Sequence, residues 1–322
     1  MPGGAKIVAR YNTSMSSFGG MHAAYGYVAW SLLLPPTRPG PHDLIVVRQP
    51  GGAIKKFHAK NHGAPWIVRV DIAGRPRVRI VYERCGSRPP CRWVSMDPQT
   101  GRLSEPAWAK LLYRRENTAA EDDTVVWGTT KGKNDRCALT RLRVNGTTVG
   151  AIPSLPGCTR MSGLGMRNGR LIATYARYRE DDPVAGESIV GVAVLNLRAP
   201  EPAWAILVEA PQRVRGGRSE YLLGGTLTND TYSILHGVND RDRDLGRVVE
   251  RWDLNAIDAA PPASGTAVPS TVLPLAPSLV AGISNIKSDG KFLYGERELR
   301  RRRPRGQTGS VGEILRLPVD GR

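Results

Sequence analysis

A short motif, in which a tight turn precedes a strand-sized apolar segment, recurs along the chain. Its six copies begin at Gly26, Arg77, Asp123, Gly169, Asp230 and Gly290. Several copies follow turn dipeptides such as Asn168-Gly169, which supply the positive φ angles that a two-residue hairpin requires. The starting points advance by 51, 46, 46, 61 and 60 residues, close to the period of one four-stranded propeller blade, about 40 to 50 residues plus loop insertions. The repetition therefore predicts a β-propeller.

The segments around the motif fit the same repeat. Each copy continues into another apolar strand, as at residues 43–48 and 188–195, and an outer strand follows. Two of the outer segments share the pentapeptide Glu-Pro-Ala-Trp-Ala, at residues 105–109 and 201–205, 96 residues apart. Five identical residues, including a tryptophan, at a distance of about two repeats indicate internal duplication.

The two ends of the chain complement each other. The sixth copy ends after its third strand, whereas residues 5–11 form a predicted strand with no partner before it. Pairing the two would complete the last blade and remove open sheet edges, which otherwise template aggregation. We therefore expect an all-β fold, a six-bladed β-propeller of four-stranded antiparallel blades whose last blade is closed by the N-terminal strand. It would form a single domain over residues 1–322, with seven blades as the alternative count.

Composition agrees with a turn-rich globular protein. Hydrophobic residues make up 40% of the chain and charged residues 23%, which excludes general disorder. The 36 glycines and 25 prolines mark the turns. No segment combines a 3.6-residue apolar period with helix caps, so helices should be scarce. No apolar run reaches the roughly 18 residues of a membrane span, and the first residues show no signal peptide.

One copy of the motif resembles a known signature. The segment 285–294, Asn-Ile-Lys-Ser-Asp-Gly-Lys-Phe-Leu-Tyr, is similar to the WD40-like repeat of TolB-like propellers, and residues 167–174 resemble it more loosely. The resemblance implies six blades and a periplasmic or extracellular setting. TolB-like domains serve as docking platforms, so the resemblance also implies a binding role.

The basic residues are the main global hint to a ligand. Lys and Arg total 46 against 29 acidic residues, a formal net charge of +17, and 37 of the 46 are arginine. Most are scattered, which argues against specific nucleic-acid recognition, and one dense run comprises Arg300, Arg301, Arg302, Arg303 and Arg305. Guanidinium groups there could bind sulfate, phosphate or carboxylate. The alternative is a solvated hairpin tip whose like charges repel each other.

The four cysteines form two local pairs, Cys85 with Cys91 and Cys137 with Cys158. An even number at short separations predicts two disulfides, and hence an extracellular or cell-envelope location. Four buried or unpaired thiols are the alternative, since sequence does not determine connectivity. No Cys-x-x-Cys pair is present, which argues against a metal site.

A possible metal loop and a possible catalytic group also stand out. Asp240, Asp242 and Asp244 have the alternate spacing of a calcium loop, but arginines separate them, which favours a solvated loop. We therefore predict no metal and no cofactor. His22 should lie on an innermost strand, with Asp122 and Glu220 on other innermost segments, and these could act as acid and base. The alternative is a channel lined by ordinary polar groups.

These observations favour a noncatalytic binding or docking platform, in which the loops on one propeller face bind the ligand. We expect that face to carry the connections between second and third strands, including the Cys85–Cys91 segment and the Arg300–Arg305 run. The expected ligand is an anionic group, a carbohydrate or a protein, and the chain is expected to be a monomer. The alternative function is a propeller-type lyase or hydrolase that uses His22 with nearby carboxylates. A structural domain of a larger protein is a third possibility.

Overall fold

The computed structural model describes most of the chain in separate stretches. They are residues 5–12, 17–33, 44–59, 64–84, 91–106, 108, 117–131, 136–145, 147–178, 188–211, 218–240, 243–260, 268–302 and 308–318. Two compact units emerge from the contacts: unit 1 is Met1–Tyr113 with Gly282–Arg322, and unit 2 is Arg114–Ala281. Within the described stretches, no helix has the length and apolar character needed to cross a membrane.

Unit 1 is built from three groups of four antiparallel strands. The first group is β2 (Ser17–Ala24), β3 (Tyr27–Leu33), β4 (Leu44–Arg48) and β5 (Ile54–His58). The second is β6 (Trp66–Ile72), β7 (Arg75–Arg84), β8 (Arg92–Met96) and β9 (Leu103–Ser104). The third is β22 (Ile283–Ser288), β23 (Leu293–Arg302), β24 (Thr308–Leu317) and β1 (Lys6–Asn12). In the first two groups each strand pairs with the next in the chain, as in a propeller blade.

Unit 2 repeats this pattern. Its strands are β10 (Asn117–Asp122), β11 (Thr124–Lys131), β12 (Arg136–Arg143), β13 (Thr148–Ala151), β14 (Arg160–Arg167), β15 (Arg170–Tyr178), β16 (Ser188–Asn196), β17 (Trp204–Pro211), β18 (Arg218–Leu227), β19 (Thr231–Asp240), β20 (Arg243–Asp253) and β21 (Thr271–Val272). They pair antiparallel in three chain-ordered groups, β10 to β13, β14 to β17 and β18 to β21. The predicted all-β, propeller-type architecture of four-stranded antiparallel sheets is confirmed.

The repeated sequence motif corresponds to the second strand of each group. Its six copies give β3, β7, β11, β15, β19 and β23. The turn before such a strand adopts the expected conformation: Asn168 and Gly169, between β14 and β15, have φ of 52° and 73°. A left-handed conformation at both positions matches the twist of the paired strands.

Inner strands such as β4 and β16 are apolar at consecutive positions because both faces of their sheets are covered. On β4, Ile45 and Val47 belong to the core shared with β6–β9, whereas Val46 belongs to the core shared with the sheet of β1 and β22–β24. On β16, Ala193 and Val194 likewise enter the cores on opposite faces. Successive side chains of a strand point to opposite faces, so a strand covered on both sides needs apolar residues throughout.

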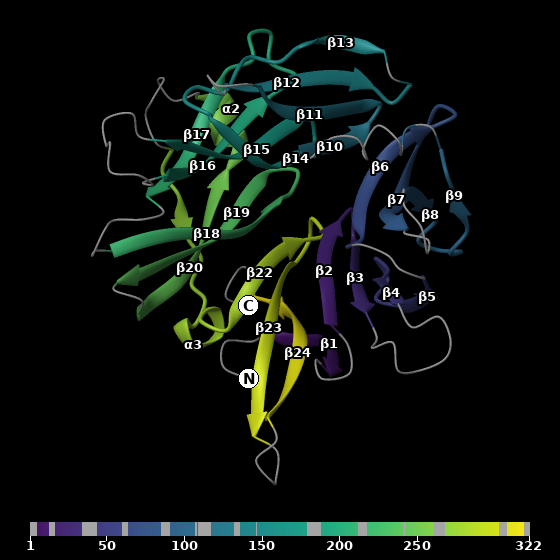
Figure 1. Ribbon diagram of the computed structural model, residues 1–322, viewed down its shortest axis with the longest axis vertical. Helices are drawn as coiled ribbons and strands as arrows, with labels where there is room; N and C mark the ends of the chain where they lie inside the picture. The colour runs from purple at the N-terminus through teal and green to yellow at the C-terminus, as the bar shows by residue number, and fades with distance from the viewer. Residues whose placement is uncertain are drawn as a thin grey trace. The chain divides into compact units, whose positions relative to one another are not determined.

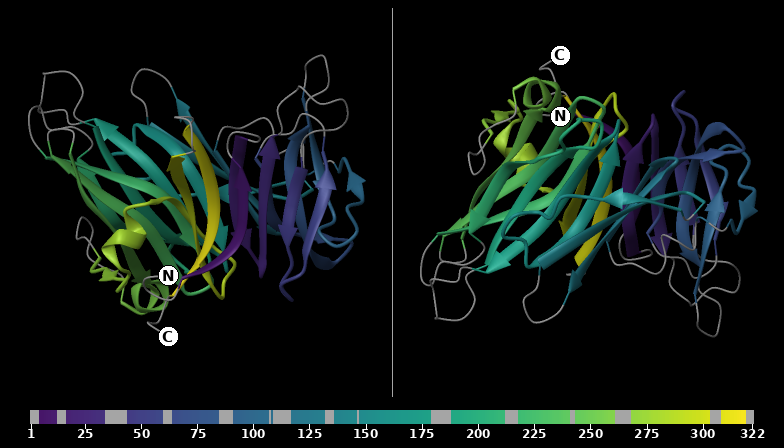
Figure 2. Two further views of the ribbon diagram at one scale, coloured as in Figure 1. Left: turned by 90° about the horizontal axis from the view of Figure 1, so that it is seen from below. Right: turned by 90° about the horizontal axis from the view of Figure 1, so that it is seen from above.

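The N-terminal strand completes the last sheet, as predicted. β1 pairs antiparallel with β24, and the two lie side by side in Figures 1 and 2, purple against yellow. Glu313 of β24, 1% exposed, accepts from Arg10 of β1 at 2.9 Å and from Arg297 of β23 at 2.5 Å. Burial alone would raise the pKa of Glu313, but the hydrogen bonds from Arg297 and Arg10 and their charges lower it. An ionised carboxylate therefore links three strands of this sheet.

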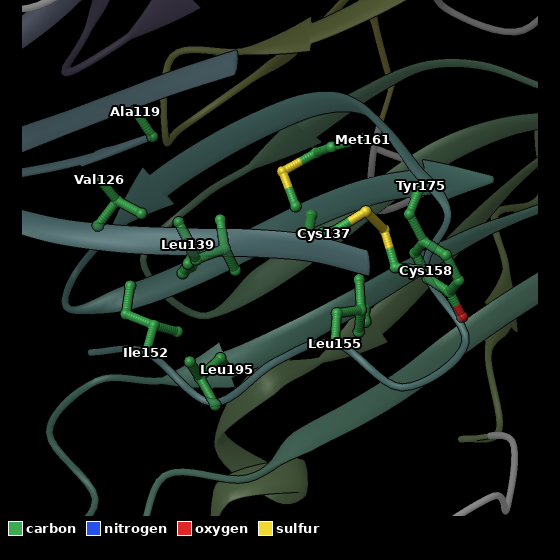
Figure 3. Close-up of a cluster of buried hydrophobic side chains, with 13 residues drawn as sticks. Ala119, Val126, Cys137, Leu139, Ile152, Leu155, Cys158, Met161, Tyr175 and Leu195 are labelled. Atoms are coloured by element: carbon green, nitrogen blue, oxygen red, sulfur yellow. A yellow bond between two sulfur atoms is a disulfide. The ribbon is translucent and has the colours of Figure 1, made fainter. Parts of the chain in front are cut away.

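One predicted disulfide is confirmed. Cys137 on β12 and Cys158, before β14, are bonded with Cα atoms 5.5 Å apart, and both are buried. Figure 3 shows the bridge among the apolar side chains of the core between β10–β13 and β14–β17. Cys91 is also disulfide-bonded, while its predicted partner, Cys85, lies outside the described residues. Closing a 21-residue separation restricts the unfolded chain and stabilises the fold by about 3 kcal/mol.

Two short helices, α2 (Leu254–Ala259) and α3 (Pro277–Val280), follow β20 and precede β22. Asp253 caps α2, because its carboxylate accepts from the amides of Asn255 and Ala256 at 2.9 and 3.1 Å. Leu254 and Ile257 of α2 then enter the core between β14–β17 and β18–β21.

Candidate functional site

Most of the arginine run lies at a hairpin tip. Arg300, Arg301 and Arg302 continue β23, and the outermost described pair of that hairpin is Arg302 with Thr308. Arg303 and Arg305 lie outside the described residues. The placement on a hairpin between a second and a third strand agrees with the sequence analysis, and ligand binding by this run stays a prediction.

Asp240 and Asp244 lie at the end of the hairpin of β19 and β20, which also joins a second strand to a third. Asp240 pairs with Arg243, and Asp244 pairs with Asn239 across the end of β19 and β20. Asp242 lies outside the described residues. In the stretches that can be described, no three His, Cys, Asp or Glu side chains gather as a metal site would require.

His22, the first catalytic candidate, lies on β2 in unit 1. Its Nδ1 accepts a hydrogen bond from the amide of Ile67 at 3.3 Å, and its ring meets Trp66 edge-on with centroids 6.5 Å apart. Accepting from an amide requires an unprotonated Nδ1. These contacts connect β2 to β6, so they give His22 a packing role.

The carboxylate candidates lie in unit 2, on first strands as predicted. Asp122 ends β10 with φ of 51°, at the turn into β11. Its neighbour Glu121 is 6% exposed and accepts from the amide of Gly169 at 3.0 Å. Asp122 therefore lies within its turn, and Glu121 holds the turn at Gly169. Glu220, on β18, has a different environment.

Glu220 belongs to a linear array with His236 on β19 and Glu250 on β20. Glu220 Oε2 lies 3.1 Å from His236 Nε2, and Glu250 Oε1 lies 3.3 Å from His236 Nδ1. The strand register explains the array: His236 is opposite Leu222 on one side and Val248 on the other. Glu220 and Glu250, two residues from those positions, share the face of His236.

Both ring nitrogens of His236 face a carboxylate, so only the doubly protonated imidazolium donates to both. The pKa of His236 is raised, chiefly by the hydrogen bond to Glu250; burial lowers it, and the charges of Glu250 and Glu220 raise it further. The His236 and Glu250 side chains are 14% and 16% exposed. The array thus pairs its own charges in a largely buried place, and we term it the Glu-His-Glu array.

A second titratable group lies in unit 1, on the face of the last sheet that packs against β2–β5. Burial raises the pKa of Glu296 on β23 to about 7, although a hydrogen bond from Tyr11 opposes this. Burial lowers the pKa of Lys287 on β22 to about 8, while Glu296 opposes the shift. Tyr11 on β1 contacts the same carboxyl. These residues join the closing strand to the sheet interior.

An open concavity of about 670 Å³ lies at one end of the β6–β9 sheet in unit 1. Its lining consists of Ile72, Ala73, Arg75, Arg77, Arg79 and Asp97. The three arginines occupy alternate positions of β7 (labelled in Figure 1), so they share one face of the strand. Val78 and Ile80 point the other way, into the core with β2–β5. We term Arg75, Arg77 and Arg79 the arginine stripe.

The turn before β7 positions the stripe. Ala73 and Gly74 have φ of 53° and 75°, which makes a two-residue hairpin of the tight, left-handed kind. Ile72 pairs with Arg75 across this turn. Arg75 therefore projects from the first residue of β7, next to the sheet end, where water and ligands have access.

The innermost arginine of the stripe is already paired. Arg79 Nη1 donates to Asp97 Oδ2 at 2.7 Å. Burial alone would raise the pKa of Asp97, but hydrogen bonds from the amides of Thr100 and Gln99 and the charge of Arg79 lower it. Asp97 is thus an ionised carboxylate, satisfied by its own turn and by Arg79.

The outer arginines differ from Arg79. Arg75 and Arg77 are exposed, and within the described stretches neither has a hydrogen bond or ion pair. Two guanidinium groups thus face the concavity without a counter-charge from the described residues, beside a third that is neutralised by Asp97. Such an arrangement can bind carboxylate, sulfate or phosphate in bidentate fashion.

The concavity and the predicted ligand loops belong to opposite ends of the strands of this sheet. It adjoins the β6–β7 and β8–β9 turns, whereas the Cys85–Cys91 segment follows the last residue of β7, at the other end of that strand. Sequence reasoning missed the stripe. The alternation Arg75-Pro-Arg-Val-Arg79 at the start of a repeat strand was the signal that could have found it.

Comparisons with known proteins complete the description. No protein-family model matches the chain, and no curated sequence matches it significantly. Among solved structures, the β-propeller domain of the trilobed protease from Pyrococcus furiosus matches with a TM-score of 0.46 and 9% identity, over 93% of this chain and 82% of that one. The phage phi92 endosialidase matches with a TM-score of 0.36 and 8% identity, over 94% of this chain and 58% of that one. A glycoside hydrolase family 43 arabinoxylan arabinofuranohydrolase from Bacillus subtilis matches with a TM-score of 0.34 and 10% identity, over 87% of this chain and 76% of that one.

Proposed function

We propose that this chain is a noncatalytic binding module that recognises anionic groups on a partner through the arginine stripe. The observation that carries the proposal is that the guanidinium groups of Arg75 and Arg77 are exposed in one open concavity and have no partner among the described residues. The surrounding scaffold would be a single six-bladed propeller of the TolB-like type, acting as a monomer. The role agrees with the binding platform expected from the sequence. The proposed ligand site, however, lies at the opposite end of the strands from the loops expected to bind the ligand.

The physical argument rests on the cost of the unbound state. Two like charges on one strand face repel each other when no anion is present. An incoming carboxylate or sulfate relieves that repulsion and accepts charge-assisted hydrogen bonds. Arg79 forms an ion pair with Asp97, so its charge is already neutralised. The anion would therefore bind to Arg75 and Arg77.

The setting we propose is extracellular or in the cell envelope. The bond between Cys137 and Cys158 supports it, because disulfides persist in oxidising compartments. A binding module in such a place would meet acidic glycans, acidic proteins and anionic surfaces.

Retention on immobilised heparin, used as a generic polyanion, tests the proposal. The variant Arg75→Ser/Arg77→Ser should elute at clearly lower salt than the wild type. The matched control Arg92→Ser/Arg143→Ser removes the same charge at positions that are 74% and 59% exposed and only loosely paired. It should shift elution much less. Equal shifts for the two variants would show that the +17 charge acts diffusely and would overturn the proposal.

The alternative of a lyase or hydrolase receives no comparable support. His22 accepts a backbone hydrogen bond in unit 1, and Asp122 and Glu220 have their own contacts in unit 2. Glu220 is committed to His236.

A further inference from the structure

The arginine stripe has a geometric period that narrows its ligand, and the inference here rests on the proposed function. Arg75 and Arg77 are two residues apart on a β-strand. Alternate residues of a strand are about 6.6 Å apart and point the same way. The two free guanidinium groups thus repeat along the strand at that distance.

An extended peptide has the same period. When it lies in a β conformation, its alternate side chains also project to one side at about 6.6 Å. Glutamates or aspartates at every second position would therefore meet Arg75 and Arg77 in register, each carboxylate facing one guanidinium. Such a match allows planar, bidentate hydrogen bonding, because one guanidinium group can donate to both oxygens of one carboxylate.

The rest of the lining agrees with a peptide of this kind. Ile72 and Ala73 place apolar surface beside Arg75 at the open end of the concavity, where it can contact side-chain methylene groups. At the other end, Arg79 is held by Asp97, which limits the register to two strong pairs. Along the stripe, β7 pairs with β6, and its pairing with β8 begins at Ile80. The guanidinium groups project from the face of the strand, so the peptide would bind them through its side chains.

We propose that the arginine stripe binds an acidic protein segment in extended conformation, with acidic residues at alternate positions. Recognition is by charge and period, so the same number of acidic residues in another order binds less well. A sulfated or acidic glycan is the competing class of ligand, and the experiment below separates the two.

Fluorescence anisotropy with labelled octapeptides tests the inference on the full chain. One peptide has four Glu-Thr repeats, and its control has the same composition in the order Glu-Glu-Thr-Thr-Glu-Glu-Thr-Thr, in which no two glutamates are two positions apart. The alternating peptide should bind about threefold more tightly than the control, a difference of about 0.6 kcal/mol, as expected for one misplaced surface ion pair. In Arg75→Ser/Arg77→Ser, both peptides should bind weakly and equally, whereas Arg92→Ser/Arg143→Ser should keep the preference.

The outcomes separate this inference from the proposed function. If both peptides bind equally and both lose affinity in Arg75→Ser/Arg77→Ser, the anion site stands and the period is wrong. If a heparin oligosaccharide depends on Arg75 and Arg77 but neither peptide binds, the ligand class is wrong and the anion site stands. If no anion depends on Arg75 and Arg77, both proposals fail.

Discussion

The arginine stripe of β7 and the Glu-His-Glu array of β18–β20 have the same strand geometry, but we assign binding to the stripe and a structural role to the array. In both, charged side chains at alternate or facing strand positions share one face of a sheet. In the array, each charge faces an opposite one within 3.3 Å, and the group is largely buried. In the stripe, Arg75 and Arg77 are exposed and have no counter-charge among the described residues. The difference teaches that pairing and exposure distinguish a structural charge from a binding one.

Replacing the central cation of the array should have the largest effect. The variant His236→Ala leaves Glu220 and Glu250 without their counter-charge in a largely buried place. Breaking a buried pair costs about 3–5 kcal/mol, and partial exposure reduces this to about 2 kcal/mol. Arg75→Ser/Arg77→Ser should change the free energy of unfolding by less than about 0.5 kcal/mol. Urea denaturation of both variants measures the contrast, and equal losses would break it.

The pH dependence of the array follows from the raised pKa of His236, caused mainly by Glu250. Its contribution to stability is fully present below the unfolded pKa of about 6.5. It is lost as the pH rises through the higher pKa of the folded state. Unfolding free energies of the wild type and of His236→Ala should therefore converge toward alkaline pH. A difference that grows with pH would contradict the imidazolium assignment.

The turn that presents the stripe offers a smaller test. Gly74 has φ of 75° and open space around the position of a Cβ, so Gly74→Ala adds backbone strain without a clash. A left-handed alanine costs about 1 kcal/mol. We expect that loss in stability together with weaker retention on heparin. The matched variant Gly51→Ala, at a glycine with open space and no positive φ recorded, should leave both unchanged.

Freeing the third arginine should give the smallest effect, in the opposite direction. Asp97→Asn removes the charge that neutralises Arg79, while its amide oxygen can still accept from Gln99 and Thr100. Anion binding should become about two- to threefold tighter, in line with one surface ion pair. Weaker binding by Asp97→Asn, with the fold intact by circular dichroism, would show that Asp97 itself contributes to the site.

The fold was largely predictable, because period, turns and apolar strands are local properties of the sequence. The closure by β1 followed from the same repeats, and the bridge between Cys137 and Cys158 followed from the even number and short separations of the cysteines. The array was not predictable as a unit. His236 lies 16 residues from Glu220 and on a different strand from Glu250, and only the strand register brings the three together. Sequence gives no register for strands apolar on both faces.

The stripe was missed for a different reason. With 37 arginines among 46 basic residues, the densest run at Arg300–Arg305 drew attention away from three alternating ones. Density in the sequence says how much charge is present, whereas alternation along a strand says which charges share a face. The structure adds the further fact that Asp97 pairs with only one of them.

The most direct test is a titration of the protein with the alternating Glu-Thr peptide, followed by NMR of the arginine Nε–Hε groups. The account predicts that the signals of Arg75 and Arg77 shift with the same saturation curve, while the ring signals of His236 stay in place. Shifts at other arginines with Arg75 and Arg77 unmoved, or no saturable shift at all, would contradict it.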